Sequence, residues 1–153
     1  MGISLEELLR QIEKQPDAIE KLFIEAKKLP QLEDVIRALA IFARSLTPKG
    51  KFYKEGERFV LYPNFVAFTP RHKRKKQVSI SLRGNVKEFE NQSVLPLKNG
   101  RAGSYSECVL NNPKQLSAAA AYIQHAYELY QEGSTRTRKA VIKTKVPISE
   151  KRV

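Results

Sequence analysis

The sequence predicts an α+β fold, with N-terminal helices followed by a mainly antiparallel sheet of four or five strands that one long C-terminal helix closes. Three observations predict it. Apolar residues recur at helical spacing through the first 46 residues, and short apolar runs separated by turn residues follow between residues 58 and 110. Another helical repeat begins after Asn112-Pro113. We therefore expect a helical segment over residues 1–46, an α+β domain over 51–132 and a disordered basic tail over 133–153.

Three helices are predicted in the N-terminal segment, each from apolar residues at helical spacing. The first follows a capping box at Ser4-Leu5-Glu6-Glu7, and the second is expected between Asp17 and Leu29. The third carries an apolar stripe from Leu32 to Leu46 that Ile41 widens, so this helix is expected to pack between neighbours. The first two helices either pack beside it or form a homodimer or partner contact through residues 4–46, and the sequence leaves both arrangements open.

Three short strands are predicted between Arg58 and Arg83. Their ranges are Phe59–Tyr62, Phe65–Thr69 and Gln77–Arg83, with a Pro63-Asn64 turn between the first two. In the third strand, apolar residues alternate with Ser79, Ser81 and Arg83. Alternation of this kind is typical of a strand with one buried face and one face in water.

The elements after this meander are shorter, except for the last helix. A further strand is predicted over Val86–Phe89, and Val94–Leu97 is interpreted as an edge strand or strand end because Pro96 interrupts it. Tyr105–Leu110 is predicted as another strand. The last helix is expected to start after Asn112-Pro113 and to end at Gly133, a residue type favoured just after a helix.

The distribution of charge indicates the class of partner. The chain has 28 Lys and Arg against 16 Asp and Glu, a formal net charge of +12. Residues 1–46 are nearly neutral, so the excess lies in the second part of the chain, where it is gathered in two runs. A polyanionic partner, DNA or RNA bound through its phosphate backbone, is therefore predicted.

The first run of cations is the loop between the second and third predicted strands, and it is the leading candidate site. Cations at the end of a rigid hairpin neutralise several phosphates at once, and Arg adds a planar fork for phosphate oxygens. The second run lies in the basic tail. The complete set of predicted nucleic-acid-binding residues is Arg71, His72, Lys73, Arg74, Lys75, Lys76, Arg83, Lys98, Arg101, Arg136, Arg138, Lys139, Lys143 and Lys145.

Two other features are candidates for contacts with a ligand. The segment from Gly100 to Glu107 is interpreted either as a phosphate cradle or as a glycine-rich hairpin turn. The aromatic residues of the sheet alternate between core positions and an exposed stacking platform for bases. These residues are Phe52, Tyr53, Phe59, Tyr62, Phe65 and Phe68.

Composition and motifs argue against several function classes. The single cysteine, Cys108, forms no internal disulfide and belongs to no zinc-ligand spacing, which favours a reducing, cytoplasmic setting. No apolar run approaches a membrane span, no metal or cofactor is predicted, and no hydrolase or nucleotide-binding fingerprint is present.

Residues 52–129 resemble a small prokaryotic domain family labelled "predicted transport protein". The resemblance rests on Phe65-Val66-Ala67-Phe68, Val78-Ser79-Ile80-Ser81-Leu82, Gly100-Arg101-Ala102-Gly103 and Ala121-Tyr122-Ile123-Gln124-His125-Ala126-Tyr127-Glu128. The family often occurs at the end of restriction-type proteins with ParB-like and HNH nuclease modules. The resemblance implies an α+β domain working beside DNA-handling machinery.

The function predicted from the sequence is a non-catalytic nucleic-acid-binding module. It is expected to contact phosphates through its basic loop and through its basic C-terminal arm. One alternative is a protein-interaction or dimerisation module of a DNA-handling or defence system. A second alternative is a small nuclease that uses Glu107, Arg101, Tyr105 or His72.

Overall fold

The computed structural model describes residues 4–5, 17–73, 75–100 and 104–143, and the side chains of the last helix up to Gly133. The helices are α2 (Ile19–Ala26), α3 (Glu33–Leu46) and α4 (Leu116–Lys143), with 3₁₀ turns η1 (Val86–Glu88) and η2 (Pro113–Gln115). The strands are β1 (Lys51–Glu55), β2 (Arg58–Tyr62), β3 (Val66–Arg71), β4 (Gln77–Arg83), β5 (Lys98–Asn99) and β6 (Tyr105–Leu110).

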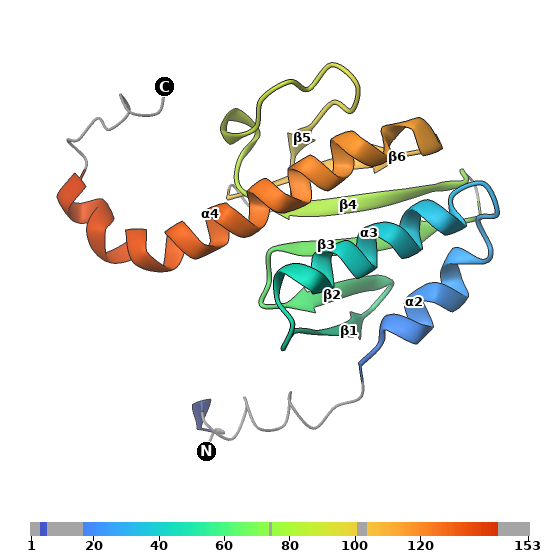
Figure 1. Ribbon diagram of the computed structural model, residues 1–153, viewed down its shortest axis with the longest axis horizontal. Coiled ribbons are helices and arrows are strands. Elements are labelled where there is room, and N and C mark those ends of the chain that lie inside the picture. The colour runs from blue at the N-terminus through green and yellow to red at the C-terminus, as the bar shows by residue number, and fades with distance from the viewer. Residues whose placement is uncertain (1–3, 6–16, 74, 101–103, 144–153) are drawn as a thin grey trace.

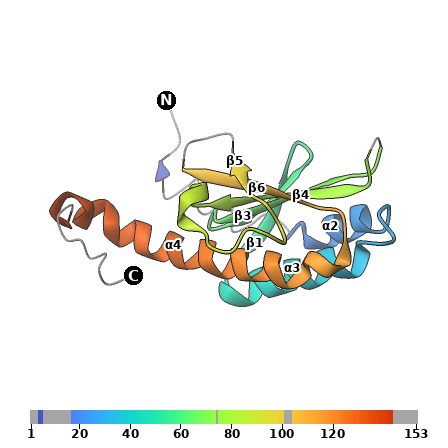
Figure 2. The same ribbon diagram turned by 90° about the horizontal axis from the view of Figure 1, so that it is seen from above.

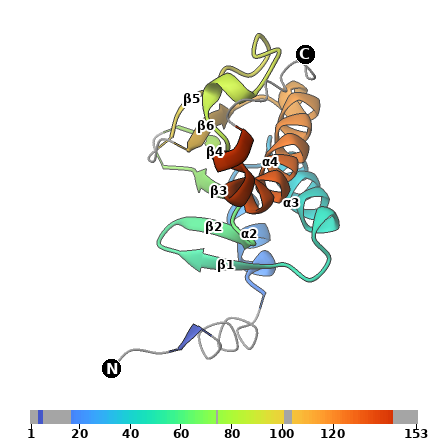
Figure 3. The ribbon, with the colours of Figure 1, turned by 90° about the vertical axis from the view of Figure 1, so that its left-hand side faces the viewer.

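The six strands form one antiparallel sheet in the order β1-β2-β3-β4-β6-β5 (Figure 1). Helices α3 and α4 lie side by side on one face of this sheet (Figures 2 and 3). The α+β prediction and its closing C-terminal helix are therefore confirmed, with six strands where four or five were expected. Strands β1 and β5 were not among the predicted strands.

The core lies between the sheet and the two helices. Strand residues Phe52, Phe68 and Ile80 pack against Ile36 of α3 and Ile123 of α4, and each of these side chains is 0% exposed. Full burial of such a side chain contributes about 1.5–3 kcal/mol. Residues of α2, of α3 and of the sheet belong to this one core, so the helical segment and the strands are packed as a unit over their described parts.

Asp17 connects the helical segment to the sheet. Its Oδ1 atom accepts hydrogen bonds from the backbone amides of Ile19, at 3.0 Å, and Phe52, at 3.1 Å, and its carboxylate is paired with Arg44. The amide of Ala18 donates to the carbonyl of Phe52 at 2.8 Å. These contacts hold the start of α2 against the edge strand β1 and occupy part of the edge's hydrogen-bonding groups.

The start of α4 agrees with the sequence, and its end does not. Asn112 caps η2 through the amide of Lys114, as the Asn-Pro pair predicts. The helix then continues through Gly133 to Lys143, so the predicted end at Gly133 is wrong. Glycine inside a helix costs only about 1 kcal/mol relative to alanine, and this cost does not oblige the helix to stop. Residues 144–153 of the predicted tail lie outside the described residues.

Two predicted strands are not strands. Val86–Glu88 is a 3₁₀ turn because Asn85 accepts from the amide of Lys87, and Glu88 accepts in return from the amide of Asn85. Residues 94–97 are irregular, and the carbonyl of Leu95 accepts a 2.6 Å hydrogen bond from the hydroxyl of Tyr122. In both segments a side chain satisfies a backbone group that would otherwise pair along a sheet.

The apolar arc of α3 is covered only in part. Ile36, Leu39 and Ala40 are buried against the sheet and α4, whereas Ile41 is 54% exposed. The helix contacts both α2 and α4, so the expectation that it packs between neighbours is confirmed, although Ile41 stays at the surface. The first predicted helix, with its capping box up to Glu7, falls largely outside the described residues.

Candidate nucleic-acid interface

The predicted basic loop is the connection between β3 and β4. Arg71 ends β3 and pairs with Gln77 at the start of β4, so residues 72–76 span the end of a closed antiparallel ladder. Pro70 lies within β3 and its side chain is buried. The loop is consequently held at both ends by the sheet, and its described cations Arg71, Lys73, Lys75 and Lys76 are exposed.

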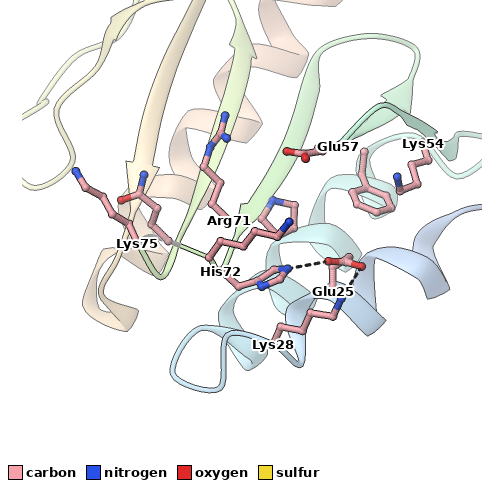
Figure 4. A pocket seen from close by; sticks show the side chains of 11 residues that line it. Glu25, Lys28, Lys54, Glu57, Arg71, His72 and Lys75 are labelled. Atoms are coloured by element: carbon pink, nitrogen blue, oxygen red, sulfur yellow. Dashed lines mark hydrogen bonds and ion pairs between the residues drawn. The ribbon is translucent and has the colours of Figure 1, made fainter.

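A cavity of about 670 Å³ opens beside this loop (Figure 4). It lies between α2 with its following turn, the β1–β2 turn, and the ends of β3 and β4. Its lining residues are Glu25, Lys28, Lys54, Glu57, Phe59, Pro70, Arg71, His72, Lys73, Lys75 and Gln77. Segments that are far apart in the sequence therefore contribute to one site.

The lining is strongly basic. It contains five permanent cations and two carboxylates, which gives a formal charge of +3 with His72 neutral. Lys28 and His72 both point to Glu25, with nitrogen–oxygen distances of 3.3 Å and 3.7 Å (Figure 4). The Lys54 ammonium donates to the carbonyl of Gly56 at 2.6 Å and lies 5.8 Å from the ring centre of Phe59.

The loop cations lack carboxylate partners. Among the described residues, no Asp or Glu oxygen lies within salt-bridge distance of Arg71, Lys73 or Lys75. Unpaired like charges gathered at one place create a positive potential that attracts anions. The site is thus suited to phosphate or another polyanion, with Arg71 offering the planar fork and the lysines offering point charges.

Two cations of this site, Lys28 and Lys54, were not among the predicted binding residues. Lys28 follows α2 and Lys54 lies in β1, 43 and 17 residues before Arg71 in the numbering. Neither belongs to a basic run, and neither carries a local signal that relates it to the loop. Only the packing of α2 against the start of the sheet brings them to the cavity.

The other predicted binding residues do not join this site. Arg83 lies at the opposite end of β4, where its guanidinium carbon is 5.6 Å from the ring centre of Tyr130 on α4. Lys98 stands opposite Glu107 across the β5–β6 pair, and Lys76 is exposed next to the cavity without lining it. Arg74, Arg101 and Lys145 lie outside the described residues.

The basic residues after Gly133 are far from the loop. Arg136, Arg138, Lys139 and Lys143 belong to the last turns of α4. Figure 1 shows this end of the helix projecting beyond the end of β4 that carries Arg83, whereas the β3–β4 loop lies at the other end of the sheet. The fold therefore places the basic loop and residues 136–143 at opposite ends of the domain.

The aromatic residues divide between the two faces of the sheet. The four phenylalanines Phe52, Phe59, Phe65 and Phe68 are fully buried. Tyr53 faces the other way, in a row of paired positions that continues through Val60, Ala67 and Ser81 to Glu107. Burial is the main reason that the pKa of Tyr53 is raised, and Tyr62 and Tyr105 add to the rise.

The face of the sheet that points away from the helices is more buried than the sequence pattern predicts. Val60 and Ala67 are each 1% exposed and Ser79 is 7% exposed, although all three point away from the helices. The expectation that Ser79 lies on a face in water is therefore wrong. Ser79 is paired with Thr69 of β3 and with Val109 of β6, so side chains of both neighbouring strands flank it.

The Gly100 segment is a hairpin turn at its described ends. The amide of Gly100 donates to the carbonyl of Tyr105 at 2.9 Å, and a Cβ atom on Gly100 would lie 3.0 Å from the Tyr105 backbone. Tyr105 pairs with Arg83, at the end of β4 opposite to His72. Six residues of strand correspond to about 20 Å, so His72 and Tyr105 do not share one catalytic site.

The described residues contain neither a metal site nor a membrane span. Within them, no group of three or more His, Cys, Asp and Glu side chains is arranged to hold a metal ion. Likewise, none of their helices combines the length and hydrophobicity needed to cross a bilayer. Comparison with protein-family models, curated proteins and solved structures yields no match to this chain, so the resemblance described above stays a prediction.

Proposed function

We propose that the protein is a nucleic-acid-binding module that contacts phosphates at the cavity beside the β3–β4 loop. The observation that carries this proposal is the convergence of Lys28, Lys54, Arg71, Lys73 and Lys75 from three parts of the fold on one concave surface. A charged turn that served only solubility would not require cations from the turn after α2 and from β1 to line the same cavity.

The mechanism is phosphate neutralisation with release of condensed counterions. Each contact between a cation and a phosphate lowers the slope of log affinity against log salt concentration by about 0.9 for duplex DNA and about 0.7 for single strands. Three to five such contacts, the number of cations that the cavity supplies, correspond to a slope of about −2 to −5. Binding is expected to tolerate changes of base sequence because phosphates carry no sequence information.

A titration of fluorescently labelled DNA and RNA of matched sequence tests this proposal. Anisotropy at several salt concentrations between 50 and 200 mM is expected to show this slope, about −2 to −5, for at least one nucleic acid. The double variant Lys73→Ala/Lys75→Ala removes two cations, so it should make the slope shallower by about 1.4 to 1.8. The double variant Lys87→Ala/Lys114→Ala removes two exposed lysines outside the cavity and serves as the control. A flat salt dependence for the unmodified protein would refute the proposal.

A second candidate function, a protein-interaction module, is favoured by exposed apolar side chains on the N-terminal helices. Ile24 of α2 is 56% exposed and Ile41 of α3 is 54% exposed. Light scattering during gel filtration of Ile24→Lys and Ile41→Lys, compared with the unmodified protein, measures their effect on self-association. A monomeric unmodified protein at high concentration would exclude homodimerisation through these helices.

A further inference from the structure

We propose that the cavity holds a terminal phosphate of a nucleotide, either at the phosphorylated end of a strand or on a free nucleotide. This inference rests on the proposed function and specifies which part of a nucleic acid enters the site. The evidence lies in the shape of the cavity, in its charge and in the chemistry of the lining residues other than the cations.

The shape favours an end over a continuous duplex. A volume of about 670 Å³ lies within the range of about 300–1,000 Å³ typical of small-ligand sites. Lys28, from the turn after α2, and Lys54 of β1 line one side of the cavity, and Arg71 and Lys75 line it from the β3–β4 hairpin, with their side chains directed away from Lys28 (Figure 4). A duplex presents its phosphates on the outside of a broad rod, so it would touch only the exposed rim. A single nucleotide or a strand end fits into the cavity.

The charge also favours a terminal phosphate. A phosphomonoester carries about −1.5 to −2 near neutral pH because its second pKa is about 6, and it offers three oxygens as acceptors. A phosphodiester inside a strand carries a single charge. The lining has an excess of three positive charges when His72 is neutral, and Glu25 is already engaged by Lys28 and His72. This excess matches a doubly charged end better than one internal phosphate.

The lining residues other than the cations, together called the floor, supply contacts for the rest of a nucleotide. Phe59, which is 1% exposed, and the buried Pro70 contribute a small apolar part of the lining, and Gln77 adds an amide that donates and accepts hydrogen bonds. Among the described residues, Glu57 has no salt-bridge partner, which leaves its carboxylate as an acceptor for a sugar hydroxyl. An inorganic anion would use only the cations, whereas a nucleotide would use the floor as well.

The test compares one labelled single strand with a 5′-phosphate, a 3′-phosphate or hydroxyls at both ends, in anisotropy titrations of the full chain. At least one phosphorylated form is expected to bind about tenfold more tightly than the hydroxyl form, since its additional charge makes charge-assisted hydrogen bonds. Lys54→Met and, separately, Lys28→Met should each remove most of this preference. Lys87→Met, outside the cavity, should retain it.

The outcomes separate this inference from the proposed function. Equal, salt-sensitive affinity for all three strands would overturn the inference and leave the proposed function standing. Absence of binding to every strand would overturn both. Competition by adenosine monophosphate or triphosphate would support the inference and identify a free nucleotide as a ligand. Equal competition by polyglutamate would overturn it, because the cavity would then select charge alone. Thermal melting of each variant confirms that it is folded.

Discussion

The two ends of strand β4 carry or adjoin basic residues that were all predicted to bind nucleic acid, and the fold surrounds these residues in different ways. At the end that begins with Gln77, Arg71 and Lys75 line a cavity and lack carboxylate partners among the described residues. At the other end, Arg83 lies over the ring of Tyr130, and its Nη2 atom would be 3.5 Å from a Cβ atom on Gly133.

This difference shows that the surroundings of a cation, and not its presence in a basic region, decide whether it is available to a ligand. A guanidinium on the face of an aromatic ring stabilises the packing of β4 against α4 by about 0.5–2 kcal/mol. Several unpaired cations around a cavity repel one another, and an anion relieves this repulsion. The contact between Arg83 and Tyr130 stabilises the fold, whereas the cluster of unpaired cations around the cavity is explained by a bound anion.

The strongest test of the comparison reverses charge at the cavity end. In Lys73→Glu/Lys75→Glu, affinity for nucleic acid is expected to fall by about 100-fold, because two phosphate contacts are replaced by two repulsions. The matched variant Lys87→Glu/Lys114→Glu should change affinity far less at the same net charge. Anisotropy titrations at one salt concentration measure the affinity of both double variants. Equal losses of affinity would show that net charge alone governs binding.

The folded protein is expected to lose stability at alkaline pH because of a buried thiol in its core. Burial raises the pKa of the Cys108 thiol from 9.0 to about 12. The folded protein then keeps this proton between these pH values while the unfolded chain releases it, so stability is full below pH 9 and falls as the pH rises. The expected loss is up to about 1.4 kcal/mol per pH unit.

Urea denaturation at pH 8, 9 and 10 measures this loss. The raised pKa values of Tyr53 and Tyr122, which burial also causes, act in the same direction at higher pH. Cys108→Ala should flatten the dependence between pH 9 and 10. If the unmodified protein were equally stable at these pH values, the thiol would not be buried as described.

The opposite end of β4 is tested by Arg83→Ala. Stability is expected to fall by about 1 kcal/mol because the contact with Tyr130 is lost, with little change in affinity for nucleic acid. Chemical denaturation and anisotropy on the same sample give both quantities. A large loss of affinity with unchanged stability would reverse the roles assigned to the two ends.

The smallest expected effect is at the ion pair on the cavity wall. His72 and Glu25 are 3.7 Å apart with side chains 28% and 29% exposed, and partly exposed pairs of this kind contribute little. His72→Gln should therefore change stability by less than about 0.5 kcal/mol in urea denaturation. A loss above 1 kcal/mol would mean that the wall is held together by this pair and not by the core beneath it.

Local patterns predicted most elements because their signals lie within a few residues. Alternating apolar residues located β4, and Asn112-Pro113 located the start of the last helix. The same signals failed where a side chain or the core overrides local preference. Asn85 converts a predicted strand into a 3₁₀ turn, and α4 continues through Gly133.

The candidate site was predictable only in part. The β3–β4 loop is a basic run between two strand patterns, so its position at the end of a hairpin followed directly from its neighbours. The contributions of Lys28 and Lys54 depend on which helix packs against which strand. The separation of the loop from the basic residues at the end of α4 depends on the direction in which that helix crosses the sheet.

The α+β class, most of the element order and the excess of positive charge in the second part of the chain can be inferred from the amino-acid sequence alone. Tertiary structure alone decided which cations meet, since contacts between distant segments come from packing apolar faces into one core and leave no mark beside the charged residues. It also decided that Arg83 packs on Tyr130 while Arg71 lines a cavity. Burial and distance set the energy of a charge, and both are properties of the folded chain.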